Sequence, residues 1–287
     1  MSQNTKIQWC DYTWNPVWGC LGGCSYCYAR GIAKRFGKQM AKFDTKYMQK
    51  NDMKGVSEQF KAKELIEFVP TALNYRFAVD FPKNAKRIFV NSMSDIAFWD
   101  THWVLMVIEK IKENPDKVFM ILTKFPEKLK SFEFPSNVWL GLTVTNQKEL
   151  DEKFMDFLDI RWKFDSFKAG KRFLSIEPML SEIDLYKRWP QLALRYYTIN
   201  SFDWIIVGGQ NGHNSIPMKQ EWVDSIIDQC EENDKPFFFK GWGQWIPKCG
   251  FCPREKSKEF FGETYFKKSK NLLGHTIDGQ YYREFPK

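Results

Sequence analysis

Six short runs of apolar, branched or aromatic residues recur along the chain, each ended by small polar or turn-forming residues. They lie at residues 87–91, 118–122, 138–143, 172–175, 204–207 and 236–239. Uninterrupted apolar stretches such as Ile205-Ile206-Val207 are typical of strands buried on both faces of a parallel sheet. Between the runs, residues 103–112 and 222–230 carry apolar residues at helical spacing. This alternation predicts βα units with right-handed crossovers, and therefore an α/β sheet or partial barrel.

Polar residues and glycines follow each predicted strand. The six segments are Asn91-Ser92-Met93-Ser94-Asp95, Thr123-Lys124, Thr143 with Thr145, Ile176-Glu177-Pro178, Gly208-Gly209-Gln210 and Lys240-Gly241-Trp242. Any one of them also fits a plain turn. Because active sites of such folds lie at the carboxyl ends of the strands, the six together predict a functional rim there.

Length and composition limit the class of protein. The 287 residues suffice for one large domain or two small ones, and 43% hydrophobic with 17% aromatic residues predict a sizeable core. No stretch approaches the roughly 20 consecutive apolar residues of a membrane span. The first residues lack the apolar segment of a secretion signal, so we expect a cytoplasmic protein without a membrane partner. In that compartment the seven cysteines are metal ligands or free thiols rather than a disulfide framework.

The charge balance indicates a polyanionic partner, DNA or RNA. The formal net charge is +8 and the sequence pI is about 9.0, and neutralising phosphates adds affinity that does not depend on sequence. Locally basic segments lie at residues 30–42, 50–63 and 267–270. Each of them also fits a solvated helix face, and the segment at 50–63 also reads as a charged excursion or helix.

Three cysteines close together carry the clearest chemical signal. Cys20, Cys24 and Cys27 follow the spacing Cys-x3-Cys-x2-Cys within residues 19–27, which we call the cysteine loop. Thiolates hold iron–sulfur clusters, and three thiolates on a four-iron cluster leave one iron without a protein ligand. Catalytic metal sites keep such a position open for substrate or cofactor.

Other interpretations of these cysteines are a zinc knuckle with a distant fourth ligand, or a disulfide with one thiol left over. Zinc sites usually repeat a Cys-x2-Cys pair with a Cys or His partner at recognisable spacing, and this loop does not. Gly22 and Gly23 favour a cluster because glycine lets the backbone approach an inorganic core closely. The residues from Tyr28 onward predict a helix that leads away from the loop.

With Tyr26 just before the last cysteine, the loop resembles the signature of the radical S-adenosylmethionine (SAM) enzymes. The resemblance implies a partial (β/α)6 barrel, a [4Fe-4S] cluster on Cys20, Cys24 and Cys27, and SAM as cofactor. In that family an electron from the cluster, supplied by a reductant such as flavodoxin or ferredoxin, breaks the sulfonium. The product is a 5′-deoxyadenosyl radical that abstracts hydrogen, so an enzyme is expected.

Seven ordered motifs between about residues 7 and 284 resemble the phage-associated three-cysteine-motif group of radical SAM proteins. They are Thr13-Trp14-Asn15-Pro16, residues 91–95, residues 122–127, Val138-Trp139-Leu140-Gly141, Ser175-Ile176-Glu177-Pro178, residues 204–209 and Phe239-Lys240-Gly241-Trp242-Gly243. Their shared order along the chain makes chance similarity improbable. The group itself is poorly characterised.

The resemblance implies contacts to SAM at several positions. Tyr26 would contact the adenine. The segment Asn91, Ser92, Ser94 and Asp95 would bind the methionyl amino group, if the first barrel strand leads into the cysteine loop, although it departs from the usual glycine-glycine-glutamate form. Ribose contacts would come from Thr143, Ser175 or Glu177, and backbone contacts from Gly208, Gly209 and Gln210. Lys124, Lys240 and Trp242 are candidate substrate contacts.

A C-terminal extension is expected after the barrel. We place the barrel at residues 1–245 and the extension at 246–287, where Asp278-Gly279 predicts a hairpin. Cys249 and Cys252 form a Cys-x2-Cys pair that suits a second cluster or zinc, completed by Cys10 or Cys230. Inert thiols in a local turn are the alternative interpretation.

Three functions compete at this point. The first is a radical SAM enzyme that modifies or repairs a nucleic-acid base or nucleotide, favoured by the basic balance and by aromatic rings that stack on unpaired bases. The second keeps the radical but acts on a small molecule or peptide. The third is a non-catalytic nucleic-acid-binding protein stapled by zinc.

Overall fold

Seven short strands form one sheet whose order follows their order along the chain, β1-β4-β5-β7-β9-β10-β11. They are β1 (Tyr12–Thr13), β4 (Arg87–Phe89), β5 (Val118–Thr123), β7 (Val138–Val144), β9 (Arg172–Ile176), β10 (Trp204–Gly208) and β11 (Phe237–Gly241). The pairs β1–β4, β4–β5, β9–β10 and β10–β11 are parallel. A strand order without reversal belongs to a βα barrel rather than to a doubly wound sheet. The predicted α/β class and partial barrel are confirmed.

The computed structural model describes residues 5, 7–162, 170–187, 198–212, 214–247, 256–268 and 274–286. All six predicted strands are present, each within two residues of its predicted bounds. The additional strand β1 is two residues long, too short for its periodicity to be recognised. The two predicted helices are α4 (Thr101–Lys112) and α6 (Gln220–Glu231), and they bury the apolar positions that predicted them.

Two compact units make up the chain. Unit 1 comprises Met1–Leu140 with Ile160–Gly170, and unit 2 comprises Gly141–Asp159 with Lys171–Lys287. The division falls inside β7, whereas the sequence suggests a boundary at residue 245 between barrel and extension. That second boundary stays a prediction. Among the described residues, no helix is long and apolar enough to span a bilayer.

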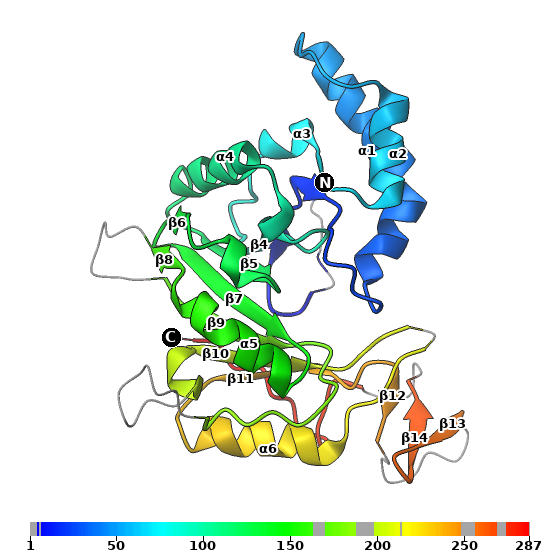
Figure 1. Cartoon of the computed structure of the whole chain (residues 1–287), viewed down its shortest axis with the longest axis vertical. Helices are drawn as coiled ribbons and strands as arrows, with labels where there is room; N and C mark the ends of the chain where they lie inside the picture. The colour runs from blue at the N-terminus through cyan, green and yellow to red at the C-terminus, as the bar shows by residue number, and fades with distance from the viewer. Residues whose placement is uncertain are drawn as a thin grey trace. The chain divides into compact units, whose positions relative to one another are not determined.

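Unit 1 contains a helical hairpin, α1 (Tyr28–Lys50) with α2 (Glu58–Glu67), drawn in blue and cyan in Figure 1. The helices pack closely because α1 has a glycine at the contact. A Cβ added to Gly37 would lie 3.2 Å from Leu65 Cβ and 3.2 Å from Ile66 Cγ1. The basic segment 50–63 is therefore the end of α1, a connection, and the first turns of α2, where the Ser57 side chain caps the helix.

A buried ion pair fixes this hairpin to the short helix α3 (Asn74–Phe77). Lys61 of α2 pairs with Asp44 of α1, and their side chains are 6% and 0% exposed. Asn74 Nδ2 donates to Asp44 Oδ2 at 3.0 Å, and the Tyr75 backbone N–H donates to Oδ1 at 3.0 Å. Both carboxylate oxygens are thereby satisfied, which a buried charge requires.

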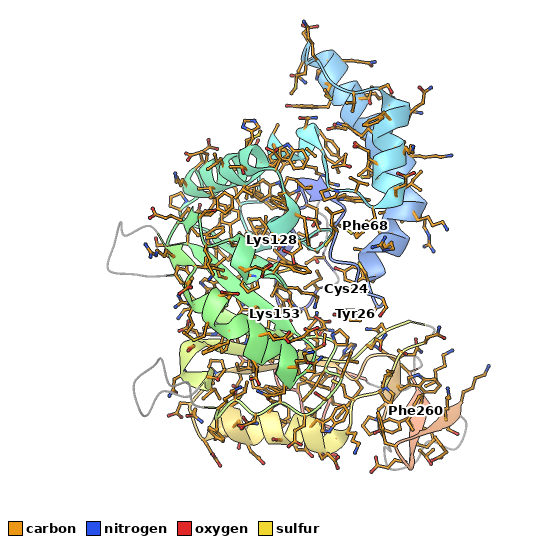
Figure 2. The ribbon with its side chains drawn as sticks, in the orientation of Figure 1. Cys24, Tyr26, Phe68, Lys128, Lys153 and Phe260 are labelled. Carbon is orange, nitrogen blue, oxygen red and sulfur yellow. The ribbon has the colours of Figure 1, made fainter. Side chains whose placement is uncertain are left out.

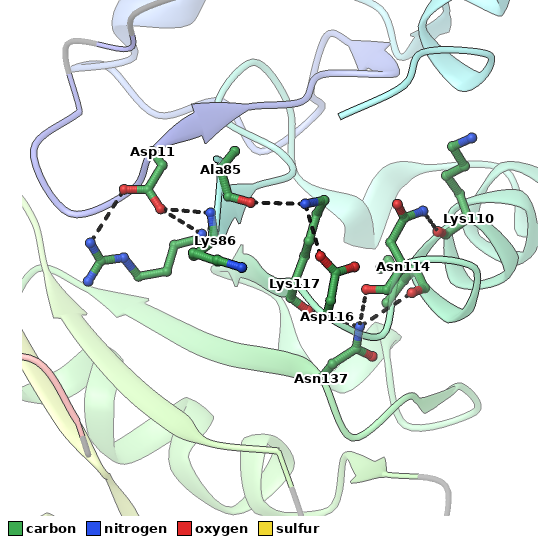
Figure 3. A network of polar contacts seen from close by, with 10 residues as sticks. Asp11, Ala85, Lys86, Lys110, Asn114, Asp116, Lys117 and Asn137 are labelled. Atoms are coloured by element: carbon green, nitrogen blue, oxygen red, sulfur yellow. Dashed lines mark hydrogen bonds and ion pairs between the residues drawn. The ribbon is translucent and has the colours of Figure 1, made fainter. Parts of the chain in front are cut away.

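Polar side chains organise the amino ends of the unit 1 strands (Figure 3). Before β1, Asp11 accepts hydrogen bonds from the Lys86 and Arg87 backbone N–H groups at 3.0 and 2.8 Å. Although partial burial raises the pKa of Asp11, these hydrogen bonds and the Arg87 charge outweigh it and lower the pKa below its usual value. Before β7, Asn137 Nδ2 donates to three carbonyl groups between 3.1 and 3.3 Å away. The opposite, carboxyl ends of the strands are left for the candidate site.

The remaining elements of unit 1 are short. They are β2 (Val17–Trp18), β3 (Thr71–Ala72), β6 (Glu133–Phe134), β8 (Arg161–Trp162), and the 3-10 turns η1 (Ile96–Phe98) and η2 (Pro126–Lys128). β2 pairs with β3 in antiparallel fashion, and β6 pairs with β8 in parallel. The core of unit 1 is aromatic: the Phe81 ring centre lies 5.1 Å from that of Trp14 and 5.3 Å from that of Phe119.

Unit 2 contains β9, β10 and β11 together with α5 (Gln147–Leu158), α6 and the 3-10 turn η3 (Thr198–Ser201). Its core is also aromatic, with Trp204 ring contacts to Phe173, Phe238 and Phe285 at 5.2 to 5.8 Å. The tail covers the edge strand β11, because Phe239 N–H donates to the Tyr282 carbonyl at 2.9 Å. A covered edge cannot pair with another chain.

The C-terminal residues add a small antiparallel sheet, β12 (Trp245–Ile246), β13 (Ser257–Phe260) and β14 (Glu263–Lys267), in the order β12-β14-β13. The predicted Asp278-Gly279 turn is confirmed. Both residues have positive φ, 47° and 83°, and Ile277 and Gln280 exchange two backbone hydrogen bonds. Positive φ at both central residues is the geometry of a type I′ hairpin turn.

We expect the substitution Asp44→Asn to destabilise the protein by about 3–5 kcal/mol, because it leaves the Lys61 ammonium buried without a counter-charge. Urea unfolding of the full chain measures this. The matched control combines Asp44→Asn with Lys61→Met, which removes both charges, and should recover most of the loss. Equal losses in the single and double variants would show that the ion pair is not the cause.

Candidate functional site

The cysteine loop is held in unit 1 by backbone hydrogen bonds at its start. Gly19 N–H donates to the Met93 carbonyl at 3.1 Å, and Cys20 N–H donates to the Phe68 carbonyl at 2.9 Å. Gly19 has φ of +98°, and a Cβ there would lie 2.1 Å from the Val69 carbonyl oxygen. Only glycine fits this position, since other residues meet both the strained φ and the clash.

The loop also ends at fixed points. Cys27 N–H donates to the Cys24 carbonyl at 3.2 Å and α1 begins at the next residue. The Tyr28 hydroxyl donates to the Ser92 carbonyl at 2.7 Å. The loop thus connects the end of β2 to the first turn of α1, as the sequence predicts for a helix leading away from the cysteines.

The glycines of the loop make a close approach possible. A Cβ on Gly22 would lie 2.9 Å from Phe125 Cε2 and 3.3 Å from Cys20 Sγ, so the loop packs directly on the Phe125 ring. Gly23 has φ of +69°, with open space around its Cα. Glycine is needed at the two positions for different reasons. At Gly22 a side chain would clash with the Phe125 ring, and at Gly23 the positive φ disfavours other residues.

The three loop thiols are free and partly exposed. Burial raises the pKa of Cys20 to about 11; the Gly22 N–H at 3.3 Å partly offsets this, while the charges of Asp95, Cys24 and Cys27 add to it. Cys24 and Tyr26 are labelled at the tip of the loop in Figure 2.

The three loop cysteines do not form an assembled metal site. Within the described ranges, no three Cys, His, Asp or Glu side chains converge as one metal ion requires. On a [4Fe-4S] cluster each thiolate would bind a different iron. The assignment of Cys20, Cys24 and Cys27 to a cluster rests on their spacing and on the glycines of the loop, and it stays a prediction.

Asn15, which precedes the cysteine loop, forms hydrogen bonds with the loop that follows β4. The Asn15 Oδ1 atom accepts hydrogen bonds from Ser92 Oγ and from the Met93 backbone N–H, both at 3.0 Å. Asn91 is buried and exchanges hydrogen bonds with the Leu122 backbone at 2.6 and 3.1 Å. Because β1 precedes the cysteines and pairs in parallel with β4, residues 91–95 do follow the second strand of the sheet, as the predicted amino-binding segment must.

Asp95 is the centre of a buried network. Its carboxylate accepts from the Ala97 N–H at 3.0 Å, the Thr123 hydroxyl at 2.8 Å and the Lys124 N–H at 2.9 Å. Burial raises the pKa of Asp95, and these hydrogen bonds and the Lys124 charge only partly counter that. Ser94 is also engaged, since its Oγ accepts from Trp99 Nε1 at 3.0 Å. The segment is thus tied first to the protein itself, and its role toward SAM stays a prediction.

Aromatic rings and lysines line the same region of unit 1. Lys124 Nζ lies 5.4 Å from the centre of the Tyr26 ring, so the two predicted contact residues are brought together. Lys128 Nζ lies 3.9 Å from the Phe98 ring centre, and the Phe98 and Phe125 rings are 4.8 Å apart. Cations over ring faces gain from the ring quadrupole. Phe125 therefore joins the glycine of the cysteine loop to this group.

In unit 2 the predicted residues gather at the carboxyl ends of β9, β10 and β11. Glu177 forms an ion pair with Lys240, with side chains 30% and 23% exposed. A Cβ added to Gly208 would lie 3.3 Å from Glu177 Oε1 and 3.3 Å from Lys240 Cβ. Thr143 and Ser175 are buried, 7% and 1% exposed. The structure thus brings three predicted residues, Glu177, Gly208 and Lys240, into contact around a half-buried ion pair.

The two glycine-containing segments of unit 2, residues 208–210 and 241–244, pack closely backbone against backbone. A Cβ on Gly209 would lie 2.1 Å from the Trp242 carbonyl oxygen, and Gly209 N–H donates to the Gly241 carbonyl at 2.9 Å. The Gln210 carbonyl accepts from Gln244 N–H at 2.8 Å. Trp242 is 2% exposed and its indole N–H donates to the Thr276 carbonyl at 2.8 Å. Its ring packs against Phe239 at 5.0 Å, and its role as a substrate contact stays a prediction.

The two candidate partners for a second metal site belong to different units. Cys10 is buried in unit 1 and Cys230 is buried on α6 of unit 2. Burial raises the pKa of Cys230 to about 12, which keeps it a thiol. Cys249 and Cys252 lie outside the described residues, so the second site stays a prediction.

The sequence analysis gave no individual role to three residues that shape the site: Asn15, Gly19 and Phe125. Asn15 lies in the motif Thr13-Trp14-Asn15-Pro16, but the motif does not show its hydrogen bond to Ser92, 77 residues away. Gly19 could have been singled out because it immediately precedes the first cysteine. Phe125 lies in the motif at residues 122–127, but its contact with Gly22 exists only in the folded chain.

Comparison with known proteins gives one family and one solved structure. A family model described as "Protein of unknown function (DUF5131)" matches residues 4–286. No curated protein matches the chain by sequence. A spore photoproduct lyase mutant with bound AdoMet and dinucleoside spore photoproduct is similar in structure, with TM-score 0.39 and 13% identity, covering 90% of this chain and 69% of that one.

We expect Cys230 to resist alkylation by iodoacetamide in the folded protein at about pH 8, because only the thiolate reacts and burial keeps this group protonated. The partly exposed Cys24, without bound metal, serves as the matched reference. Site-resolved mass spectrometry measures both rates. Comparable rates for the two cysteines would contradict the buried position of Cys230.

Proposed function

We propose that this chain, which belongs to the DUF5131 family of proteins of unknown function, is a radical SAM enzyme that acts on a nucleic-acid base or nucleotide. The observation that carries the proposal is the cysteine loop. Three free thiols with Cys-x3-Cys-x2-Cys spacing lie between the first strand of a parallel sheet and a long helix. When bound, a [4Fe-4S] cluster with SAM supplies a 5′-deoxyadenosyl radical for hydrogen abstraction.

Different residues of unit 1 would bind the cluster and the adenine of SAM. Cys20, Cys24 and Cys27 hold three irons and leave the fourth for SAM. Tyr26, with Lys124 near its face, offers a flat surface to the adenine. The rings of Phe98 and Phe125 shield the loop from water, which a radical reaction requires. An external reductant such as flavodoxin or ferredoxin delivers the electron.

The amino and ribose groups of SAM have proposed partners as well. For the amino group, the proposed partner is the segment Asn91, Ser92, Ser94 and Asp95. Asn91 and Asp95 are buried and already hydrogen-bonded within the protein, which leaves the Ser92 and Ser94 oxygens of the segment to accept from an ammonium. By the resemblance to radical SAM enzymes alone, Glu177 would accept from a ribose hydroxyl, and the backbone at Gly208, Gly209 and Gln210 would allow close approach. Thr143 and Ser175 are the alternative ribose contacts. Lys240, already paired with Glu177, orients that carboxylate.

The choice of a nucleic-acid substrate rests on the net charge of +8. A small molecule or peptide is the alternative substrate, and membership of the phage-associated group stays a prediction. A zinc-stapled binding protein is the alternative without catalysis. Metal and sulfide analysis after oxygen-free purification separates the classes: iron with acid-labile sulfide supports the enzyme, and stoichiometric zinc alone excludes it.

Replacing one loop cysteine tests the ligand assignment. We expect Cys24→Ala to abolish both iron–sulfide incorporation and cleavage of SAM to 5′-deoxyadenosine, because two thiolates do not hold the cluster in place. Cys230→Ala, which removes a buried thiol far from the loop in sequence, is the matched control and should retain both. SAM cleavage that survives in Cys24→Ala would refute the assignment.

The contact between Gly22 and Phe125 gives an independent test of the loop geometry. We expect Gly22→Ala to strain the loop by about 1–3 kcal/mol, as overpacking usually does, and to reduce iron incorporation. Adding Phe125→Leu should restore part of it by making room. Gly31→Ala, at an exposed α1 position with no atom within 4 Å, is the control and should bind iron normally.

A further inference from the structure

Every charged side chain that is exposed on α1 is cationic. Its seven basic residues, Arg30, Lys34, Arg35, Lys38, Lys42, Lys46 and Lys50, are all exposed. The helix has a single acidic residue, Asp44, which is buried and already paired with Lys61. One helix therefore contributes most of the chain's net charge of +8.

Six of these cations recur at every fourth residue. They are Arg30, Lys34, Lys38, Lys42, Lys46 and Lys50, which we call the α1 stripe. Each step of four residues advances about 6 Å along the helix and rotates by about 40°, so the stripe runs about 30 Å and turns through about 200° around the helix axis.

Other helices of this protein treat their lysines differently. On α4, Lys112 pairs with Glu109, and on α5, Lys148 and Lys153 pair with Glu152 and Glu149. In the described part of the chain, none of the five stripe lysines forms an ion pair. Like charges four residues apart destabilise a helix, and a merely solvated face mixes both signs, as α4 and α5 do. The stripe therefore has the composition of a binding surface.

Exposed aromatic rings also lie on α1. Phe36 and Phe43 are 40% and 45% exposed, and Arg35, a cation outside the stripe, lies 5.9 Å from the Phe36 ring centre. Rings near cations suit unpaired bases near phosphates, since stacking and charge then act on the same strand. A membrane surface would need a broad apolar face, but most apolar residues of α1, including Ala33, Met40 and Ala41, are buried in the hydrophobic cluster that includes α2.

We propose that the α1 stripe, with Phe36 and Phe43, is a docking surface for single-stranded nucleic acid. The cations neutralise backbone phosphates and the two rings stack on bases. Arg30 lies three residues after Cys27, so a strand on this surface leads to the cysteine loop. The surface is argued from α1 alone, and only its role in delivering a base to the loop rests on the proposed function.

The test is binding of a mixed-sequence single-stranded DNA oligonucleotide to the full chain, measured from about 50 to 200 mM salt. We expect Lys42→Gln with Lys46→Gln to weaken binding about tenfold and to reduce the slope of log K against log salt by about 1.4, because two phosphate contacts are lost. Phe36→Ala with Phe43→Ala should weaken single-strand binding fivefold or more, and duplex binding less.

The matched control is Lys112→Gln with Lys148→Gln, which removes the same number of charges from α4 and α5 and should leave affinity and slope unchanged. Equal effects of both lysine pairs would overturn the proposal, as would binding without salt dependence or no binding at all. Anionic phospholipid vesicles bound more tightly than the oligonucleotide, with the same dependence on Lys42 and Lys46, would assign the surface to membranes and overturn it as well.

The outcome is separable from that of the proposed function. SAM cleavage without nucleic acid should be unchanged in Lys42→Gln with Lys46→Gln, and oligonucleotide binding should be unchanged in Cys24→Ala. A protein that cleaves SAM but does not bind the oligonucleotide defeats the docking surface alone. A protein that binds it through α1 but takes up no iron defeats the radical chemistry alone.

Discussion

The candidate site depends on the hydrogen bonds that join the cysteine loop to the loop after β4. Asn15 Oδ1 accepts hydrogen bonds from Ser92 Oγ and the Met93 N–H. The Gly19 N–H donates to the Met93 carbonyl, and the Tyr28 hydroxyl donates to the Ser92 carbonyl. These bonds fix the loop at its entry and at the first turn of the helix that follows it. A loop anchored at both ends holds its thiols in a limited set of positions without a metal, which lowers the ordering cost of binding one.

Charge is distributed unevenly within unit 1. Inside unit 1, buried carboxylates have partners: Asp95 accepts three hydrogen bonds, and Asp44 forms an ion pair with Lys61. On the outer face of α1, none of the stripe lysines forms an ion pair within the described residues. Since burial of Asp44 removes the only acid of that helix from the surface, the same ion pair that fixes the hairpin also leaves only cations among the exposed charges of α1.

Much of the fold follows from local patterns in the sequence. The run Ile205-Ile206-Val207 lies in β10, and the apolar positions of α4 face the core, because buried strands and amphipathic helices have periods that a sequence displays. β1 was not predicted, because two residues are too few to show the alternation of apolar and polar residues that marks a strand. Within the site, the cysteine spacing and the glycines were recognisable, whereas the contact of Phe125 with Gly22 joins residues far apart in the chain and leaves no local pattern.

The sequence by itself determined the α/β class, the positions of six strands, the three clustered thiols and the cationic repeat of α1, because each of these is a spacing between neighbouring residues. Only the tertiary structure decided which polar residues are already satisfied. Asp95 and Trp242 read as available from the sequence, yet both are buried and hydrogen-bonded within the protein. Burial and hydrogen-bond partners depend on which segments meet in space, and no local spacing records that.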